Sequence, residues 1–456
     1  MSFRVGLVAV ALHLAFASHA GAGEPDPLAA KAGQFRAQIH ARHLAPEGVL
    51  LYRVALDTIA SDLATGAYPE LADGPFFTGL FAGAACARAE SAAGAARDEA
   101  LADAARALSG VELLMRVTGV QGLLARSVRR APPDPHTRGE WHEGRGEYAG
   151  WYWRGDVSLD QYANGLVSAA GLCRRLFPER ARALAVDAAQ HLLAHDFHVT
   201  DPDGERTRYG DLSWRSGLGW NSIAQLTGYA IVALAAELAP DQPRLLETRD
   251  RLRDRYRVVA RAGLTNLRVF GITGHSNDLM AFSLYRVLLP LARETGDPAE
   301  ADLRYGLYRA WLRVREDRSA YFTLVFCSLE PESCDAALLA GARDQLAAFP
   351  LEKRNLGSPP EALEIPTRLV PGRKWKRLAS ELVPIELRPV SSFEWKSSPY
   401  RIRGHASPDT EYTGLDYLVA WWLYESVCAT RADCSAPDSR IPADAPIQNG
   451  SGATAP

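Results

Sequence analysis

The feature that most constrains the fold of this chain is an alternation between two kinds of helical segment. Six segments carry small, apolar and aromatic residues on nearly all faces, at 76–86, 160–172, 220–234, 277–289, 318–329 and 414–424. One-sided, charged segments lie between them, at 97–117, 179–194, 245–262 and 299–314. A helix that is apolar all round is buried on every side, whereas a one-sided helix faces solvent. The alternation therefore predicts an all-α fold of hairpins, each with a buried inner and an amphipathic outer helix, in a closed ring.

This succession of hairpins resembles the six-hairpin, or (α/α)6, toroid superfamily, which includes glycoside hydrolases, polysaccharide lyases and sugar epimerases. The resemblance covers residues 28–430 and rests on the helix pattern and the loop content. It implies an (α/α)6 toroid as one catalytic-type domain at 23–434, with a saccharide in its central cleft. Because one toroid hosts several chemistries, the resemblance implies the fold more strongly than the reaction.

The two ends of the chain differ in composition from the helical region. Arg4 is followed by an apolar run at 5–17 and by the small residues Ala20 and Ala22, a pattern that predicts a signal peptide at 1–22. Residues 435–456 are rich in Pro, Ser, Ala and Gly, and we expect a disordered tail there. The predicted location is therefore periplasmic or secreted.

Composition also narrows the classes of partner. The formal net charge is -3, whereas sequence-independent binding of nucleic acid needs a strong excess of Lys and Arg. No later segment has the roughly 20 consecutive apolar residues that a membrane span requires. We therefore expect an oligosaccharide or polysaccharide substrate and neither nucleic acid nor a membrane as partner, and the oligomeric state stays open.

The six cysteines fit an oxidising compartment. Two pairs lie close in sequence around turns, and the predicted local disulfides are Cys327–Cys334 and Cys428–Cys434. Cys86 and Cys173 lie in Ala- and Leu-rich helical segments, where we expect free thiols that behave as small hydrophobes. The spacings do not match those of zinc sites, and we expect no metal and no cofactor.

Two regions depart from the helical pattern. Residues 119–159 are predicted to form a long loop rich in aromatic and charged residues, and ordered loops of that length are usually functional. Residues 355–412 are Pro-rich, with a β-like run at 382–390, and are predicted to form a small hairpin or flap.

Polar residues precede several of the inner helices, whose N-terminal ends converge on one mouth in such a ring. Glycoside hydrolysis needs two carboxyl groups on opposite sides of the bond that breaks. The candidates are Asp156, paired with Asp160 or Glu147, and Glu143 is a further carboxylate of the same loop. Asp160 has an alternative role as a helix cap, and the glutamates as solvated loop charges.

Aromatic and polar residues near the same helix ends are candidates for binding the sugar. Aromatic faces stack on sugar rings, and side-chain amides and guanidinium groups bind polar substituents. The predicted binding residues are Arg126, Tyr152, Trp153, Arg154, Tyr162, Trp214, Trp220, Asn221, Asn277 and Trp395. Ordinary core packing is the alternative for each of the aromatic residues.

His275 supports a rival chemistry. Toroidal polysaccharide lyases use an Asn or Arg to neutralise a uronate carboxylate and a His or Tyr as base and acid, and the resemblance implies such roles for His275, Asn277, Tyr152 and Arg154. A lyase is therefore the first alternative to the glycoside hydrolase. A saccharide-binding toroid without catalysis is the second.

Overall fold

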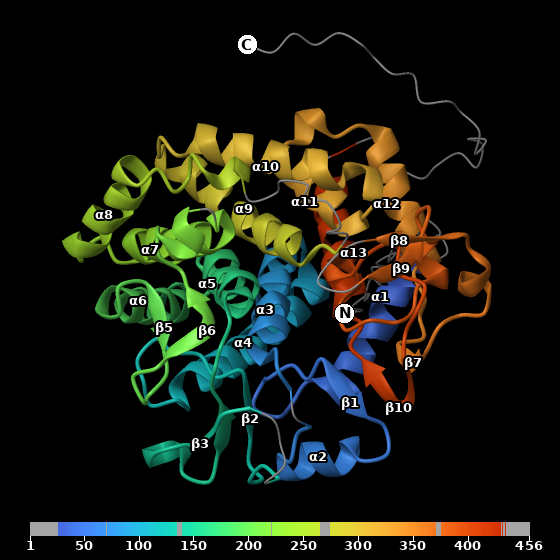
Figure 1. Ribbon diagram of the computed structural model, residues 1–456, viewed down its shortest axis with the longest axis horizontal. Helices are drawn as coiled ribbons and strands as arrows, with labels where there is room; N and C mark the ends of the chain where they lie inside the picture. The colour runs from blue at the N-terminus through green and yellow to red at the C-terminus, as the bar shows by residue number, and fades with distance from the viewer. Residues whose placement is uncertain are drawn as a thin grey trace, which may run out of the picture.

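The computed structural model describes residues 26–69, 71–134, 139–219, 221–264, 274–370, 375–429, 431 and 434. Within them, outer helices surround a group of inner helices (Figure 1). The predicted signal peptide and the predicted tail lie outside the described residues.

The inner helices correspond to the segments predicted to be apolar all round. They are α3 (Gly74–Ser91), α5 (Val167–Cys173), α7 (Ser222–Leu238), α9 (Ser276–Thr295), α11 (Ala320–Leu329) and α13 (Leu415–Cys428). A π-helical segment, η3 (Gln161–Leu166), leads directly into α5. The first fifteen residues of α7 are all buried, as its sequence predicts.

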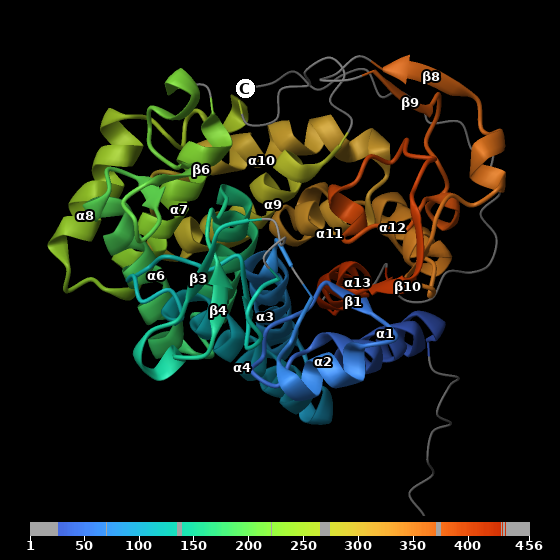
Figure 2. The ribbon, with the colours of Figure 1, turned by 60° about the horizontal axis from the view of Figure 1, so that its bottom comes forward.

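Each inner helix packs against an outer helix. The outer helices are α4 (Gly94–Arg116), α6 (Pro178–Ala194), α8 (Pro243–Asp250), α10 (Glu300–Val314), α12 (Ala336–Ala348) and α1 (Pro27–Gln38). The last inner helix, α13, packs against α1 and also against α3, so the first helix of the chain pairs with the last and closes the ring (Figure 2). The predicted toroid of helical hairpins is confirmed.

The inner helices approach one another closely where glycines face each other. A Cβ atom on Gly79 of α3 would lie 2.3 Å from the carbonyl oxygen of Gly165 in η3, and one on Gly165 would lie 2.3 Å from the carbonyl oxygen of Pro75. Only glycine fits such a contact between backbones. This contact fixes the distance between the first two inner helices.

The predicted long loop at 119–159 contains a small antiparallel sheet, which is a correction to the sequence-based expectation. Its strands are β2 (Ser127–Arg129), β4 (Tyr152–Arg154) and β3 (Trp141–Glu143), with β4 in the middle. Its strands have only three residues each, too few for an alternating pattern to stand out. The sheet leads the chain into η3.

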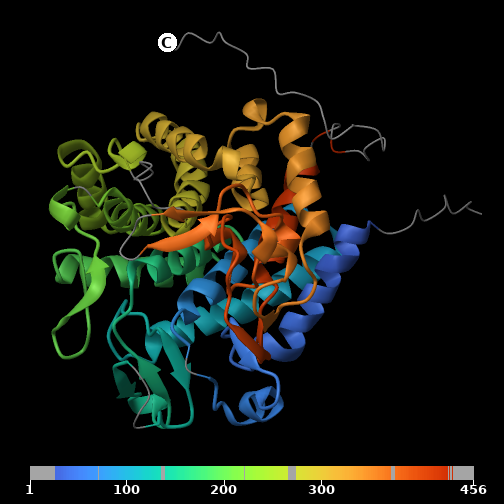
Figure 3. The same cartoon turned by 45° about the vertical axis from the view of Figure 1, so that its right-hand side comes forward.

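The remaining strands form three further small sheets. They are β1 (Arg53–Ala55), β10 (Ala406–Tyr412) and β7 (Arg354–Leu356); β5 (His198–Thr200) and β6 (Arg206–Asp211); and the hairpin of β8 (Thr367–Val370) and β9 (Lys376–Ala379). The short helix α2 (Ile59–Thr65) follows β1. Figure 3 shows the β8–β9 hairpin in front of the helical ring.

The predicted flap is present, but its strands are not where we expected them. The run 382–390 contains a 3-10 turn at Ile385–Leu387 instead of a strand, and the strands β7 to β10 lie on either side of it. Pro384 and Pro389 explain the difference, because proline lacks the N–H that a sheet ladder needs.

The predicted outer helix 245–262 is also shorter than expected. Its α-helical part ends at Asp250, a π-helical turn continues it over Arg251–Arg255, and Arg257 has a φ of 51°. A residue with positive φ cannot continue a right-handed helix.

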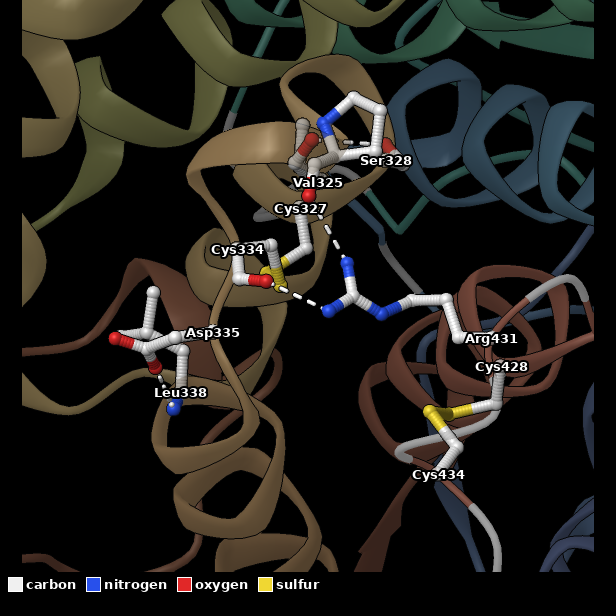
Figure 4. Close-up of a disulfide and its surroundings, with 10 residues drawn as sticks. Val325, Cys327, Ser328, Cys334, Asp335, Leu338, Cys428, Arg431 and Cys434 are labelled. Atoms are coloured by element: carbon white, nitrogen blue, oxygen red, sulfur yellow. Dashed lines mark hydrogen bonds between the residues drawn. A yellow bond between two sulfur atoms is a disulfide. The ribbon is translucent and has the colours of Figure 1, made fainter.

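Three disulfides connect the described cysteines. Cys327–Cys334 and Cys428–Cys434 form as predicted, and Arg431 donates hydrogen bonds to the carbonyl oxygens of Pro331 and Cys334, which joins the two disulfide regions (Figure 4).

The expectation that Cys86 and Cys173 are free thiols is wrong. The two residues form a disulfide between α3 and α5, with Cα atoms 5.2 Å apart. They are 87 residues apart in sequence, so only the close packing of these two helices brings them together.

The described part of the chain contains neither a candidate membrane span nor a candidate metal cluster. None of the described helices combines the length and the apolar character needed to cross a membrane. No cluster of three or more His, Cys, Asp or Glu residues in the described part of the chain is arranged to hold a metal ion.

Candidate functional site

Asp73 lies at the N-terminal end of α3, and its carboxylate is not used to cap the helix. Instead, Oδ1 lies 3.6 Å from Nη2 of Arg126, and Oδ2 lies 3.6 Å from Nζ of Lys396. The side chain of Asp73 is 20% exposed. A carboxylate at a helix N-terminus usually caps it, so the orientation of Asp73 leaves its charge at the mouth of the ring.

Arg126 connects Asp73 with the loop that carries Asp156. Its Nε donates to the carbonyl oxygen of Ala72, 2.8 Å away, and its Nη1 donates to the carbonyl oxygen of Asp156, 2.9 Å away. Gln161, the first residue of η3, donates to the same Ala72 carbonyl. The guanidinium group of Arg126 therefore joins the segments that precede α3 and η3, and it positions Asp73 and Asp156.

Asp156 is held in a conformation that costs energy. Its φ is 53°, in the left-handed region that residues other than glycine adopt at a cost of about 1 to 3 kcal/mol. Its N–H donates to Oδ2 of Asp201, 3.0 Å away, and its Oδ1 accepts from the N–H of Arg208, 2.8 Å away. Together with the bond from Arg126, these contacts fix the half-buried Asp156 in place.

Asp201, which accepts the hydrogen bond from the N–H of Asp156, was not among the predicted site residues. It is buried, and burial raises the pKa of its carboxyl. Its Oδ1 has no hydrogen-bond partner within the described parts of the chain. The sequence around it, Asp201-Pro-Asp203-Gly-Glu205, indicates a turn, which is why it did not stand out.

The other predicted carboxylates lie in different surroundings. Asp160 is half-buried and accepts a hydrogen bond from Oγ of Ser158, 2.6 Å away, without capping the helix that follows. Glu147 and Glu143 are exposed in the β3–β4 hairpin. This hairpin pairs Glu143 with Tyr152, so its loop is at the end of the sheet away from Asp156.

Three of the predicted aromatic residues are core residues. Trp153, Tyr162 and Trp395 are 1%, 0% and 2% exposed. Trp153 stacks on His142, the Tyr162 hydroxyl donates to the carbonyl oxygen of Gly122, and Nε1 of Trp395 donates to the carbonyl oxygen of Asp416. In this structure their faces are covered by protein.

The remaining predicted binding residues are distributed around the ring. Tyr152 and Arg154 are half-buried in β4, and Trp214 stacks on Tyr256 with ring centroids 4.3 Å apart. Asn221 accepts a hydrogen bond from the N–H of Ala224 and caps α7. Asn277 is exposed in the first turn of α9, and Trp220 lies outside the described residues.

Aromatic residues surround Asp73, although the sequence prediction did not include them. Tyr52 is partly buried and stacks on Phe77, with centroids 4.7 Å apart. Burial, together with the charge of Asp73, raises the pKa of Tyr52. The ammonium group of Lys396 lies 4.8 Å from the centre of the Phe76 ring. Lys396 directly follows Trp395 in the sequence, and no local pattern there indicates that it lies beside α3.

His275, at the N-terminal end of α9, belongs to a network of paired charges. Its Nδ1 lies 3.0 Å from Asp278 and its Nε2 lies 3.2 Å from Asp317. Arg313 donates to Asp278, and the Tyr400 hydroxyl donates to Asp317. Burial by itself would lower the pKa of His275, but the two carboxylates raise it above its ordinary value. The carboxylates beside the two ring nitrogens therefore favour the protonated, positively charged form of His275.

Comparison with known proteins gives little further guidance. No family model matches the chain, and no curated protein matches it. One similar solved structure is a Zn-binding triple mutant of the glycoside hydrolase family 9 endoglucanase J30, with a TM-score of 0.44, 14% sequence identity, and coverage of 88% of this chain and 84% of that chain. A similarity this distant indicates neither an activity nor site residues for the present chain.

Proposed function

We propose that this protein is an exported carbohydrate-active enzyme that hydrolyses glycosidic bonds at the mouth of the helical ring. The observation that supports the proposal is that Arg126 lies 3.6 Å from the carboxylate of Asp73 and donates to the main-chain carbonyl oxygen of Asp156, so that one guanidinium group adjoins both aspartates near the N-terminal ends of α3 and η3. Hydrolysis of a glycosidic bond requires two carboxyl groups that act on the two sides of the bond. The three disulfides support export, because disulfides persist in oxidising compartments.

The surroundings of the two carboxylates suggest different roles. Asp73 lies between two cations, Arg126 and Lys396, and is suited to act as the charged base or nucleophile. Asp156 is then the acid that protonates the leaving oxygen, and its rigid backbone conformation keeps it in place. Tyr152 and Arg154, which the sequence predicted to bind the sugar, and Tyr52, near Asp73, are the side chains that we propose to contact it.

The lyase alternative is less well supported. A base for β-elimination must accept a proton from the sugar, but both ring nitrogens of His275 face carboxylates that favour its protonated form. Tyr152, the tyrosine that the resemblance implied, is half-buried in β4. Tyr52, near Asp73, is a second tyrosine candidate for the base, and burial raises its pKa, which opposes formation of the phenolate.

The test is to incubate the purified protein with neutral and uronate polysaccharides and to follow reducing ends and ultraviolet absorbance together. Hydrolysis predicts reducing ends without the absorbance of a new C=C bond, and D156N should abolish them. Asp98, exposed on α4, provides the matched control D98N, which should be fully active. Absorbance that rises with the reducing ends would replace the proposal with the lyase, and binding without any product would leave the non-catalytic toroid.

A further inference from the structure

Arg286 lies in the middle of α9 on the side that faces the interior of the ring. Tyr285, its neighbour, points outward, because its hydroxyl donates to the carbonyl oxygen of Ala262 beside the outer helix α10. Ser283 points inward and donates to Oδ1 of Asn164 in η3, 2.9 Å away. Arg286 follows Ser283 by three residues, so the two share one face of the helix.

The guanidinium group of Arg286 is buried without an anionic partner. Arg286 is only 9% exposed, and its Nη1 has no hydrogen-bond partner in the described part of the chain. The fully buried hydroxyl of Tyr321, on α11, lies beside it, and its polar neighbours are Arg286 and Ser283. Two polar groups from neighbouring inner helices therefore meet in the interior with unused hydrogen-bonding capacity.

Other buried cations in the structure do have carboxylate partners. Nζ of Lys353 lies 2.7 Å from Asp416, and Nη1 of Arg388 lies 3.0 Å from Glu394. For Arg286, the carboxylate that acts on it is Glu90, near the far end of α3, and no ion pair joins the two. Burial lowers the pKa of Arg286, yet a guanidinium group does not lose its proton in a protein. An unpaired buried charge costs several kcal/mol, which a nearby anion offsets.

We propose that Arg286 and the Tyr321 hydroxyl form a binding site for a small inorganic anion of the halide class in the interior of the ring. Both groups can donate hydrogen bonds, and the guanidinium supplies the positive charge. The anion binds to the folded protein only, and it therefore stabilises the fold.

The position of the site favours a free anion over an acidic group of a saccharide. Arg286 lies ten residues beyond Ser276, the first residue of α9, which corresponds to about 15 Å of helix rise. The Tyr321 ring contacts Phe393, and Phe393 contacts Phe76 at the start of α3. All three rings are buried, and together they form a continuous layer of packed side chains from Tyr321 to the start of α3. A small ion can pass such a layer when the side chains move, whereas a sugar ring cannot.

Two measurements test this proposal independently of any catalytic activity. Thermal unfolding is compared in sodium chloride and in sodium gluconate at the same ionic strength, because gluconate is too large for the site. We expect the unfolding temperature to be several degrees higher in chloride for the native protein and equal in the two salts for R286M. Arg174, which pairs with Glu294 on the surface, provides the control R174M, which should keep the chloride effect.

The second measurement uses crystals of the native protein grown with sodium bromide, so its result does not depend on whether R286M folds. An anomalous peak within hydrogen-bond distance of Arg286 and Tyr321 is expected. Equal unfolding temperatures of the native protein in the two salts, or the lack of a bromide peak at Arg286, would overturn the proposal.

Discussion

Two clusters of charged residues lie at the N-terminal ends of inner helices and are built from similar residue types, yet they differ in how completely their charges are paired. At α9, His275 has a carboxylate at each ring nitrogen, and Asp278 is fully buried. At α3, Asp73 is 20% exposed, and its two cations lie at 3.6 Å, beyond hydrogen-bond distance. A buried network of paired charges contributes to stability, whereas a partly exposed carboxylate with remaining hydrogen-bonding capacity is available to a ligand.

Replacement of Asp73 is the strongest test of this contrast. We expect D73N to lower kcat on the polysaccharide that the protein hydrolyses by about 10²- to 10⁴-fold, the usual contribution of an acid or base group. The free energy of unfolding should change by less than about 1 kcal/mol, because Asp73 is partly exposed and caps nothing. Steady-state kinetics and urea unfolding of D73N and D98N measure both quantities. An active D73N would remove Asp73 from the mechanism.

Replacement of His275 should have the opposite effects, with a large loss of stability and little change in activity. H275Q leaves Asp317 and Asp278 without their shared cation, so we expect it to lower the free energy of unfolding by about 3 kcal/mol. The activity per folded molecule should change little. Urea unfolding gives the first quantity, and kinetics at a temperature where H275Q is folded gives the second. A large loss of kcat with unchanged stability would instead assign His275 to the catalytic site.

The pH dependence of stability sharpens the same comparison. Because the pKa of His275 is raised in the folded state, its contribution is complete below the unfolded value of about 6.5 and is lost as the pH rises through the folded value. Asp278, whose pKa is lowered, loses its contribution only at acidic pH. The stability difference between the native protein and H275Q should therefore be largest near about pH 6 and should shrink as the pH rises. Urea unfolding from about pH 6 to 10 measures it, and a constant difference would contradict the prediction.

The helical ring was predictable from the sequence because it depends on local patterns. Segments such as 222–238 are apolar on all faces, and such a helix has to be buried whatever surrounds it. The Cys86–Cys173 disulfide was not predictable in this way, because it depends on the approach of α3 and α5, which the glycines at 79 and 165 permit. Spacing along the chain contains no information about that approach.

The candidate site was predicted only in part, for the same reason. Asp156 stood out because it lies in a loop rich in aromatic residues just before an inner helix. Its neighbours Asp201 and Arg208, and the partner Lys396 of Asp73, come from distant parts of the chain. The buried positions of Trp153 and Tyr162 also depend on tertiary packing, because aromatic residues at the start of an inner helix are equally suited to the core and to the binding of a sugar.

The smallest effect is expected for Glu147, which the sequence placed among the candidate carboxylates. Glu147 is exposed, and the pairing of Glu143 with Tyr152 and of Trp141 with Arg154 puts it at the end of the β3–β4 hairpin opposite to Asp156. E147Q should therefore retain kcat within about twofold and unfold within about 0.5 kcal/mol of the native protein. The same kinetic assay used for D73N measures it. A loss of activity comparable to that of D73N would mean that the hairpin folds over the mouth when substrate binds, and the second carboxylate would then be Glu147.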